Sequence, residues 1–78
     1  MYTVYILECG DQSHYVGCTS NLENRLVRHN RREIHYTKTR LPLKVITTIQ
    51  FQERHRAYEF EKYLKSGSGR AFMKKRLI

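Results

Sequence analysis

The pattern of apolar and polar residues at the start of the chain predicts a β-hairpin. Residues 2–7 are β-branched, aromatic or aliphatic, a composition that favours a strand. Residues 10–13 read Gly-Asp-Gln-Ser and supply turn chemistry, and extended character resumes over residues 14–17. We therefore expect two antiparallel strands joined by a short turn.

Alternation along these two strands assigns their side chains to faces. Successive side chains of a strand point to opposite faces of a sheet. Thr3, Tyr5 and Leu7 therefore share one face of the first strand. Tyr15 and Gly17 share one face of the second strand. The alternation allows Tyr5 and Tyr15 to lie on a common face of the hairpin.

Chemistry typical of a helix start follows the hairpin. Ser20 is followed three residues later by Glu23, which matches a capping box, and apolar residues then recur in helical spacing. The pattern predicts a helix over about residues 21–30. The next stretch, residues 31–43, is polar and basic and contains the only proline, Pro42. We expect it to be an irregular connection.

The remainder of the chain predicts one more strand and two helices. Residues 45–51 are dense in β-branched residues, and alternation places four of them on one face: Val45, Thr47, Ile49 and Phe51. Helical spacing returns over residues 53–65, and the Ser-Gly-Ser-Gly stretch at residues 66–69 is expected to end that helix. A last helix is expected over about residues 70–77.

The expected order of elements is strand, strand, helix, strand, helix, helix, which is an α+β fold. A small three-stranded antiparallel sheet would be flanked by the helices. A chain of 78 residues has room for one domain, so residues 1–78 are expected to form a single domain. A core of this size leaves no space for a large cofactor cradle.

Charge is distributed unevenly along the chain. It carries 15 Lys and Arg against 7 Asp and Glu, a net charge of +8, and residues 1–24 contain no Lys or Arg. Such an excess indicates a polyanionic partner, with nucleic acid as the leading candidate. A basic surface that only keeps the protein solvated stays open as the alternative. The residues expected to contact phosphates are Arg28, Arg31, Arg32, Lys38, Arg40, Lys74 and Lys75.

The number of cysteines and the hydropathy of the chain indicate where in the cell the protein is located. Cys9 and Cys18 match neither a disulfide-rich secreted scaffold nor a four-ligand zinc site, so free thiols in a reducing compartment are expected. No apolar run approaches the roughly 18 residues of a membrane span, and the chain starts without a basic leader. These features predict a cytoplasmic protein without a membrane anchor.

Two polar residues of the first expected helix adjoin its apolar stripe. Arg25 and His29 fall within about 60° of Leu22 when roughly 100° is allowed per residue. They are four residues apart and so lie on neighbouring turns of one face. An arginine beside a histidine at the edge of a core is well placed to bind a phosphate. The alternative, an arginine stem covering the core beside a packed histidine, stays open.

An acidic residue falls inside the apolar stripe of the second long helix. Glu61 shares the face of Ala57, Phe60 and Leu64, whereas Glu59 faces away. Burying an unpaired carboxylate costs several kcal/mol. Glu61 must therefore be paired with a cationic side chain such as Arg25, be protonated, or bind a divalent cation, and spacing alone does not decide among these.

These residues occur in the order found in a known family. The segments are Thr3-Val4-Tyr5, Tyr15-Val16-Gly17, the run from Asn21 to His29, and the run from Phe60 to Gly67 that contains Glu61. Over essentially its whole length the chain resembles the GIY-YIG nuclease superfamily, and most of all its small stand-alone members, relatives of the excision-repair nuclease module. It departs from the family pattern with Thr-Val-Tyr for Gly-Ile-Tyr and with Val16 for isoleucine, but keeps both tyrosines.

The resemblance implies a metal-dependent endonuclease that hydrolyses phosphodiester bonds in DNA. Glu61 would hold one divalent ion, Mg²⁺ or Mn²⁺, and Arg25 would neutralise charge on the phosphate. Tyr5 would be the general base, its phenolate favoured by Arg25 and the metal, while Tyr15 and His29 would position the water or relay protons.

The resemblance also bears on substrate and partners. Cleavage would be structure-selective or weakly sequence-specific, on single-stranded or branched DNA, in repair or recombination. Two alternatives remain: a catalytically silent module that only binds nucleic acid, and a subunit that needs a partner protein for activity or targeting. The sequence leaves the oligomeric state open.

Overall fold

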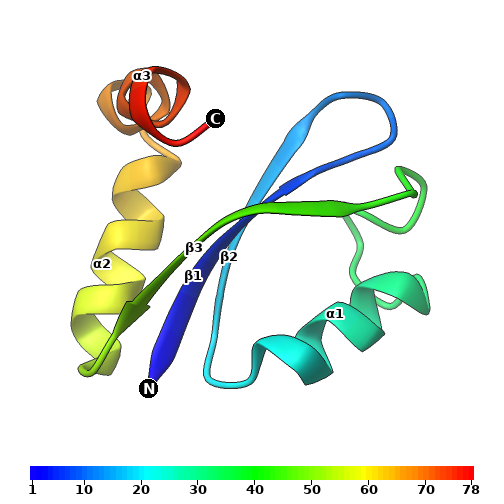
Figure 1. Ribbon diagram of the computed structural model, residues 1–78, viewed down its shortest axis with the longest axis horizontal. Helices are drawn as coiled ribbons and strands as arrows, with labels where there is room; N and C mark the ends of the chain where they lie inside the picture. The colour runs from blue at the N-terminus through cyan, green and yellow to red at the C-terminus, as the bar shows by residue number, and fades with distance from the viewer.

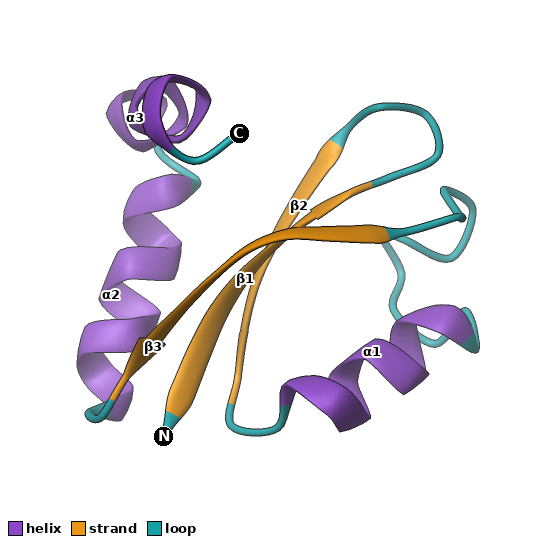
Figure 2. Ribbon diagram, in the orientation of Figure 1, coloured by secondary structure: helices purple, strands orange, loops and turns teal.

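The computed structural model describes residues 1–78 and confirms the expected order of elements (Figure 1). The elements are β1 (Tyr2–Glu8), β2 (His14–Thr19), α1 (Leu22–Asn30), β3 (Lys44–Phe51), α2 (Arg54–Leu64) and α3 (Gly67–Arg76). Helix α1 lies on one side of the sheet, and α2 and α3 lie on the other (Figure 2). None of the helices is both long and apolar enough to cross a membrane.

The three strands form one antiparallel sheet in the order β2-β1-β3. The central strand β1 is buried from Thr3 to Leu7, so both of its faces are covered. In the pairing with β2, Val4 lies opposite Cys18 and Tyr5 lies opposite Gly17. Alternation then assigns the side chains of β1 to two different layers.

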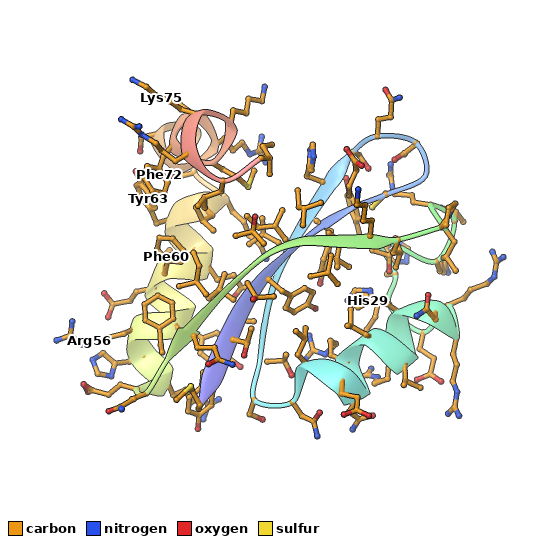
Figure 3. All side chains as sticks on the ribbon, in the orientation of Figure 1. His29, Arg56, Phe60, Tyr63, Phe72 and Lys75 are labelled. Carbon is orange, nitrogen blue, oxygen red and sulfur yellow. The ribbon has the colours of Figure 1, made fainter.

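The layer between the sheet and α2 and α3 is the main hydrophobic core. Its buried members are Val4, Ile6, Val16, Cys18, Ala57, Leu64 and Met73. A row of aromatic rings on its outer side links β3, α2 and α3 (Figure 3). The ring centroids are 5.5 Å apart for Phe51 and Phe60, 6.2 Å for Phe60 and Tyr63, and 6.1 Å for Tyr63 and Phe72. Removing this apolar area from water is the main force that attaches the two helices to the sheet.

The other face of β1 is covered by α1 and by the irregular segment 31–43, which is irregular as expected. Tyr5 and Leu7 are fully buried on this face. The backbone N–H of Gly10 donates to the carbonyl of Arg40 at 2.6 Å. This hydrogen bond ties the irregular segment to the turn of the hairpin.

A bulge in β3 corrects one expected face. Ile6 pairs with Thr47, but the next residue, Leu7, pairs with Val45, so Ile46 is the extra residue. A residue inserted in this way reverses which face the following side chain occupies. Ile46 therefore packs against the core, while Val45 is 40% exposed and does not share the face of Thr47.

The start of α1 lies one residue later than the predicted capping box. The cap is Asn21, whose side chain accepts a hydrogen bond from the backbone N–H of Asn24 at 3.0 Å. The prediction that Ser20 and Glu23 form a capping box is wrong. Asparagine is at least as good a cap as serine, so the helix begins at Leu22.

The start of α3 also differs from expectation. Helix α2 ends at Leu64, directly before residues 66–69 as expected, but α3 begins at Gly67 rather than at residue 70, and the hydroxyl of Ser66 accepts from the N–H of Gly69 at 3.2 Å. The serine cap outweighs the weak helix propensity of two glycines. Gly69 is buried against the backbone carbonyl of Tyr63, where a Cβ would overlap that carbonyl.

The two glycines of α3 therefore respond differently to a methyl group. We expect Gly69→Ala to lower the free energy of unfolding by about 1–3 kcal/mol because it forces the two helices apart. Gly67→Ala meets no atom within 4 Å and should leave stability equal or higher, since alanine favours a helix. Urea unfolding followed by circular dichroism measures both, and equal losses would contradict the packing described for Gly69.

Candidate active site

Tyr5 lies at the centre of the molecule, on the face of β1 covered by α1. Its side chain is fully buried, and its ring crosses Gly17 of the edge strand β2 so closely that a Cβ on Gly17 would overlap it. Glycine at this position therefore allows the ring to cross the strand. The Tyr5 hydroxyl is directed towards α1, where it meets His29.

A chain of hydrogen bonds runs from Tyr5 into the irregular segment. The Tyr5 hydroxyl lies 2.9 Å from Nε2 of His29, and Nδ1 of His29 lies 2.7 Å from Oγ1 of Thr37. The Thr37 hydroxyl donates to the carbonyl of Ile34 at 3.4 Å. Because its proton is used there, Thr37 accepts from Nδ1–H, and Nε2 of a neutral His29 is left to accept from Tyr5. Both His29 and Thr37 are fully buried, and Figure 3 shows His29 between α1 and the sheet.

The environment keeps Tyr5 and His29 neutral. Burial raises the pKa of Tyr5 to about 12, with a further contribution from the Tyr15 phenol. The charge of Arg25 lowers this pKa, as expected, but burial outweighs it, so Tyr5 is not a phenolate at neutral pH in this structure. Burial also lowers the pKa of His29, as do the charges of Arg25 and Arg28.

The predicted convergence of the two hairpin tyrosines is confirmed. The ring centroids of Tyr5 and Tyr15 are 6.1 Å apart, and those of Tyr15 and His29 are 5.1 Å apart. Nη1 of Arg25 lies 3.5 Å from the Tyr5 hydroxyl. Four of the five residues expected to be catalytic are therefore brought together on the α1 face of the sheet.

The fifth, Glu61, approaches from α2, which packs on the opposite face. Its side chain is 17% exposed, and its Oε2 accepts from Nζ of Lys65 at 3.1 Å. The cationic partner considered for Glu61 from the sequence was Arg25; the structure instead provides Lys65, one helical turn away. Burial is the main cause that raises the pKa of Cys18 on β2, and the charge of Glu61 raises it further. The charge of Glu61 makes only the smallest contribution to the raised pKa of Tyr5.

The donor set around Glu61 fits one type of metal ion. No group of three or more His, Cys, Asp or Glu side chains in the chain could hold a metal, so a closed site made only of protein ligands is not available. Mg²⁺ is commonly bound by one or two carboxylates together with water and substrate phosphates. A single, partly exposed carboxylate such as Glu61 fits that mode of binding.

The basic residues predicted to contact phosphates have different environments. Arg28 pairs with Glu33 at 3.4 Å, and Arg32 donates to the carbonyl of Lys38 at 3.1 Å. The exposed members are Arg28, Arg31, Arg32, Lys38, Lys74 and Lys75. Arg40 is only partly exposed and has a structural role.

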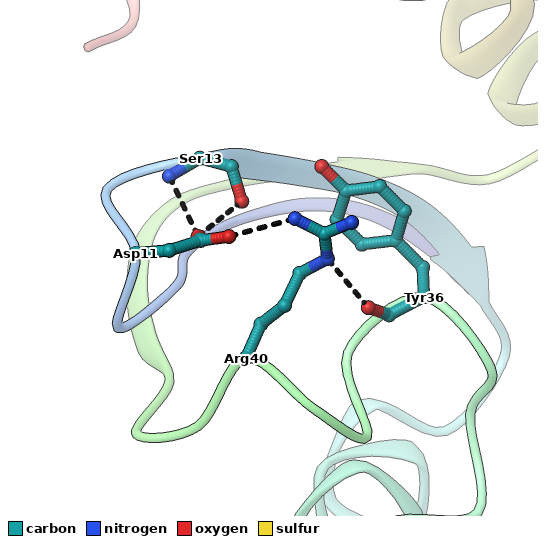
Figure 4. Close-up of polar contacts among 4 residues, drawn as sticks. All are labelled: Asp11, Ser13, Tyr36 and Arg40. Carbon is teal, nitrogen blue, oxygen red and sulfur yellow. Dashed lines mark hydrogen bonds and ion pairs between the residues drawn. The ribbon is translucent and has the colours of Figure 1, made fainter.

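Arg40 fastens the irregular segment to the hairpin (Figure 4). Its Nη1 lies 2.7 Å from Oδ2 of Asp11, and its Nε donates to the carbonyl of Tyr36 at 2.9 Å. Its guanidinium carbon lies 4.2 Å from the centre of the Tyr36 ring, which in turn packs on Tyr15 at 5.5 Å. Hydrogen bonds from Ser13 and the charge of Arg40 lower the pKa of Asp11 to about 2. Arg40 is thus already engaged within the protein.

Sequence reasoning missed three polar residues of this site: Asp11, Thr37 and Lys65. Asp11 lies in the turn and Thr37 in the irregular segment, where no periodic pattern assigns a face. Lys65 carried a signal that could have found it, because a lysine four residues after a glutamate on a helix is a favourable pair.

A family model described as the GIY-YIG catalytic domain matches residues 1–76. Similar proteins include the UPF0213 protein YsiG of Lactococcus lactis, 42% identical over 65 residues that make up 82% of this chain and 62% of that protein. The UPF0213 protein CPE1444 of Clostridium perfringens is 41% identical, over 83% of this chain and 71% of that protein. The chain spans less than two thirds of the length of YsiG.

A solved structure is also similar over most of the chain. The solution NMR structure of the UPF0213 protein BH0048 from Bacillus halodurans matches with a TM-score of 0.61 and 30% identity. The match covers 96% of this chain and 84% of that one. The arrangement of elements described above is therefore shared with a solved protein.

The buried neutral His29 makes stability depend on pH. Its pKa is lowered in the folded state, so below about pH 6.5 the unfolded chain binds a proton that the folded protein does not. The free energy of unfolding should therefore fall with decreasing pH, with a contribution from His29 of at most about 1.4 kcal/mol per pH unit. Urea unfolding at a series of pH values measures this slope. It should be smaller in His29→Gln and unchanged in His35→Gln, which removes an exposed histidine.

Proposed function

Because this chain belongs to the GIY-YIG family of nucleases, whose catalytic-domain model spans residues 1–76, we propose that it is a metal-dependent endonuclease that hydrolyses phosphodiester bonds in DNA. The observation that carries the proposal is the buried hydrogen bond of 2.9 Å between Tyr5 and His29, with Arg25 and Tyr15 beside it. A hydroxyl held by a neutral imidazole can accept a proton while giving up its own.

Tyr5 and His29 act together as the general base. As water attacks the phosphorus, its proton passes to the Tyr5 oxygen while the Tyr5 proton passes to Nε2 of His29. A phenol with a pKa of about 12 is thereby used without forming a free phenolate. The buried hydrogen bond from Nδ1 to Thr37 keeps Nε2 available as the acceptor. Tyr15, whose ring packs on both groups, positions them.

Arg25 and Glu61 bind the two charged components of the reaction. Arg25 extends to the Tyr5 hydroxyl and neutralises negative charge growing on the nonbridging phosphate oxygens. Glu61 would hold one Mg²⁺ or Mn²⁺. Such an ion, when bound, polarises the phosphate and stabilises the leaving oxygen.

The charge of the surface supports a nucleic-acid substrate. Exposed basic residues such as Arg31, Lys38 and Lys74 attract the phosphate backbone. Since contacts of this kind are independent of sequence, we propose that the protein recognises the structure of single-stranded or branched DNA. A role in DNA repair or recombination, with or without a partner protein, would fit such a substrate.

Two glutamates on α2, Glu61 and Glu59, test whether Glu61 is the metal-binding residue. Glu61→Gln should reduce the rate of DNA cleavage in Mg²⁺ or Mn²⁺ by about a hundredfold or more because the ion loses its charged ligand. Glu59→Gln removes the same charge from an exposed position of the same helix and should cleave like wild type. The measurement uses labelled single-stranded, duplex, flap and four-way DNAs, and chelation of the metal should stop the reaction.

The same panel separates the competing functions. Arg25→Ala should also cleave at least about a hundredfold more slowly, with its circular dichroism spectrum unchanged. Equal cleavage by wild type and Glu61→Gln would refute the assignment of Glu61 to the active site. If wild type binds the DNAs but does not cleave them, the endonuclease activity is refuted and a nucleic-acid-binding module is favoured.

Thr37 is proposed as a positioning residue for the base. Thr37→Val removes the acceptor of the Nδ1 proton, so His29 can protonate Nε2 instead, and cleavage should slow by about tenfold or more. Nitrogen NMR of the histidine ring should show Nδ1 protonated in wild type and a mixture of tautomers in the variant. In wild type the rate should decline only below the ordinary histidine pKa of about 6.5. A variant with the wild-type rate, tautomer and pH profile would exclude this role.

A further inference from the structure

A groove of about 510 Å³ lies beside the proposed active site, between the edge strand β2 and helix α3. Leu64 and Met73 of the two C-terminal helices and Val16 of β2 form its apolar floor, and all three are buried. This volume is within the range of pockets that hold small ligands, roughly 300–1,000 Å³. A single nucleotide fits such a space, whereas a base-paired duplex exceeds it.

The rim of the groove is positively charged. Lys65, Arg70 and Lys74 line it, together with His14, and no Asp or Glu side chain does. Arg70 and Lys74 are exposed, and neither belongs to any of the ion pairs in the protein. Two cations one helical turn apart without acidic partners form a surface that attracts phosphates.

The groove is continuous with the proposed catalytic residues. Tyr15 lines it and also packs on Tyr5 and His29. Lys65 lines it and binds Glu61. The groove therefore adjoins both the Tyr5–His29 pair, through Tyr15, and Glu61, through Lys65.

We infer that this groove binds one nucleotide of the substrate strand next to the scissile phosphate. Arg70 and Lys74 bind its phosphates, and its base lies on the apolar floor. This inference rests on the proposed function and adds to it a subsite in which the neighbouring nucleotide is unpaired. It also separates two adjacent residues of α3, since Lys74 lines the groove and Lys75 does not; Figure 3 shows Lys75 on the outer side of the helix.

The salt dependence of binding tests the phosphate contacts. A short fluorescein-labelled single-stranded DNA is titrated with protein in EDTA, and the affinity is measured by anisotropy over a range of salt concentrations. Each lost phosphate contact should reduce the slope of log affinity against log salt by about 0.7. The double variant Arg70→Ala/Lys74→Ala should therefore lower the slope by about 1.4 and bind more weakly.

The control removes the same charge outside the groove. Arg56→Ala/Arg76→Ala changes one exposed arginine on α2 and one on α3, and neither lines the groove. Its slope should stay close to that of wild type. Equal slopes for the two double variants would overturn the inference, because only net charge would then matter.

A second measurement locates the base and keeps the inference separate from catalysis. In nitrogen–proton correlation spectra, a thymidine trinucleotide should shift the amides of Leu64, Lys65, Arg70 and Lys74, and an abasic analogue should shift that of Leu64 much less. Shifts confined to other surfaces would overturn the inference. If wild type cleaves no DNA but these shifts appear, nucleotide binding in the groove is supported and the endonuclease activity is refuted. If wild type cleaves DNA and Arg70→Ala/Lys74→Ala binds and cleaves it equally well, nucleotide binding in the groove is refuted and the endonuclease activity is supported.

Discussion

The structure depends on satisfying two polar groups that are buried in the middle of a very small domain. Tyr5 and His29 are fully buried, and leaving either without a partner would cost about 1–3 kcal/mol, a large share of the stability of such a domain. They bond to each other and, through Thr37, to the segment after α1. No buried side-chain nitrogen or oxygen in the protein lacks a partner. The same hydrogen bonds thus hold α1 on the sheet and orient the groups proposed for catalysis.

Most of the fold was predictable because hydrophobic periodicity reports directly on which side chains are buried. The strands, the helices, their order and the shared face of Tyr5 and Tyr15 followed from alternation and helical spacing. The errors arose where a single local interaction decides the outcome. Ser66 starts α3 through one hydrogen bond, and one extra residue at Ile46 moves Val45 to the other face. Neither effect leaves a repeating pattern in the sequence.

The candidate site was predictable to the extent that its residues lie on regular elements. Arg25, His29 and Glu61 were found because polar residues next to an apolar stripe need an explanation. Thr37 was not found, because it lies in an irregular segment where no periodic pattern assigns a face. The contact of Asp11 with Arg40 was not found, because it joins the turn to that segment 29 residues further along the chain. The neutral state of Tyr5 was also missed, since the depth of burial that sets its pKa is a property of packing in three dimensions.

The position of β2 at the edge of the sheet has a consequence for self-association. An exposed strand edge is a template on which another chain can add a strand. In this protein Tyr5 crosses β2 at Gly17 on one face, and α2, which carries Glu61, packs against β2 on the other. A second molecule that extended the sheet at β2 would cover the entrance for any bound polymer. Dimerisation by strand addition is compatible with an open site only at the opposite edge, β3.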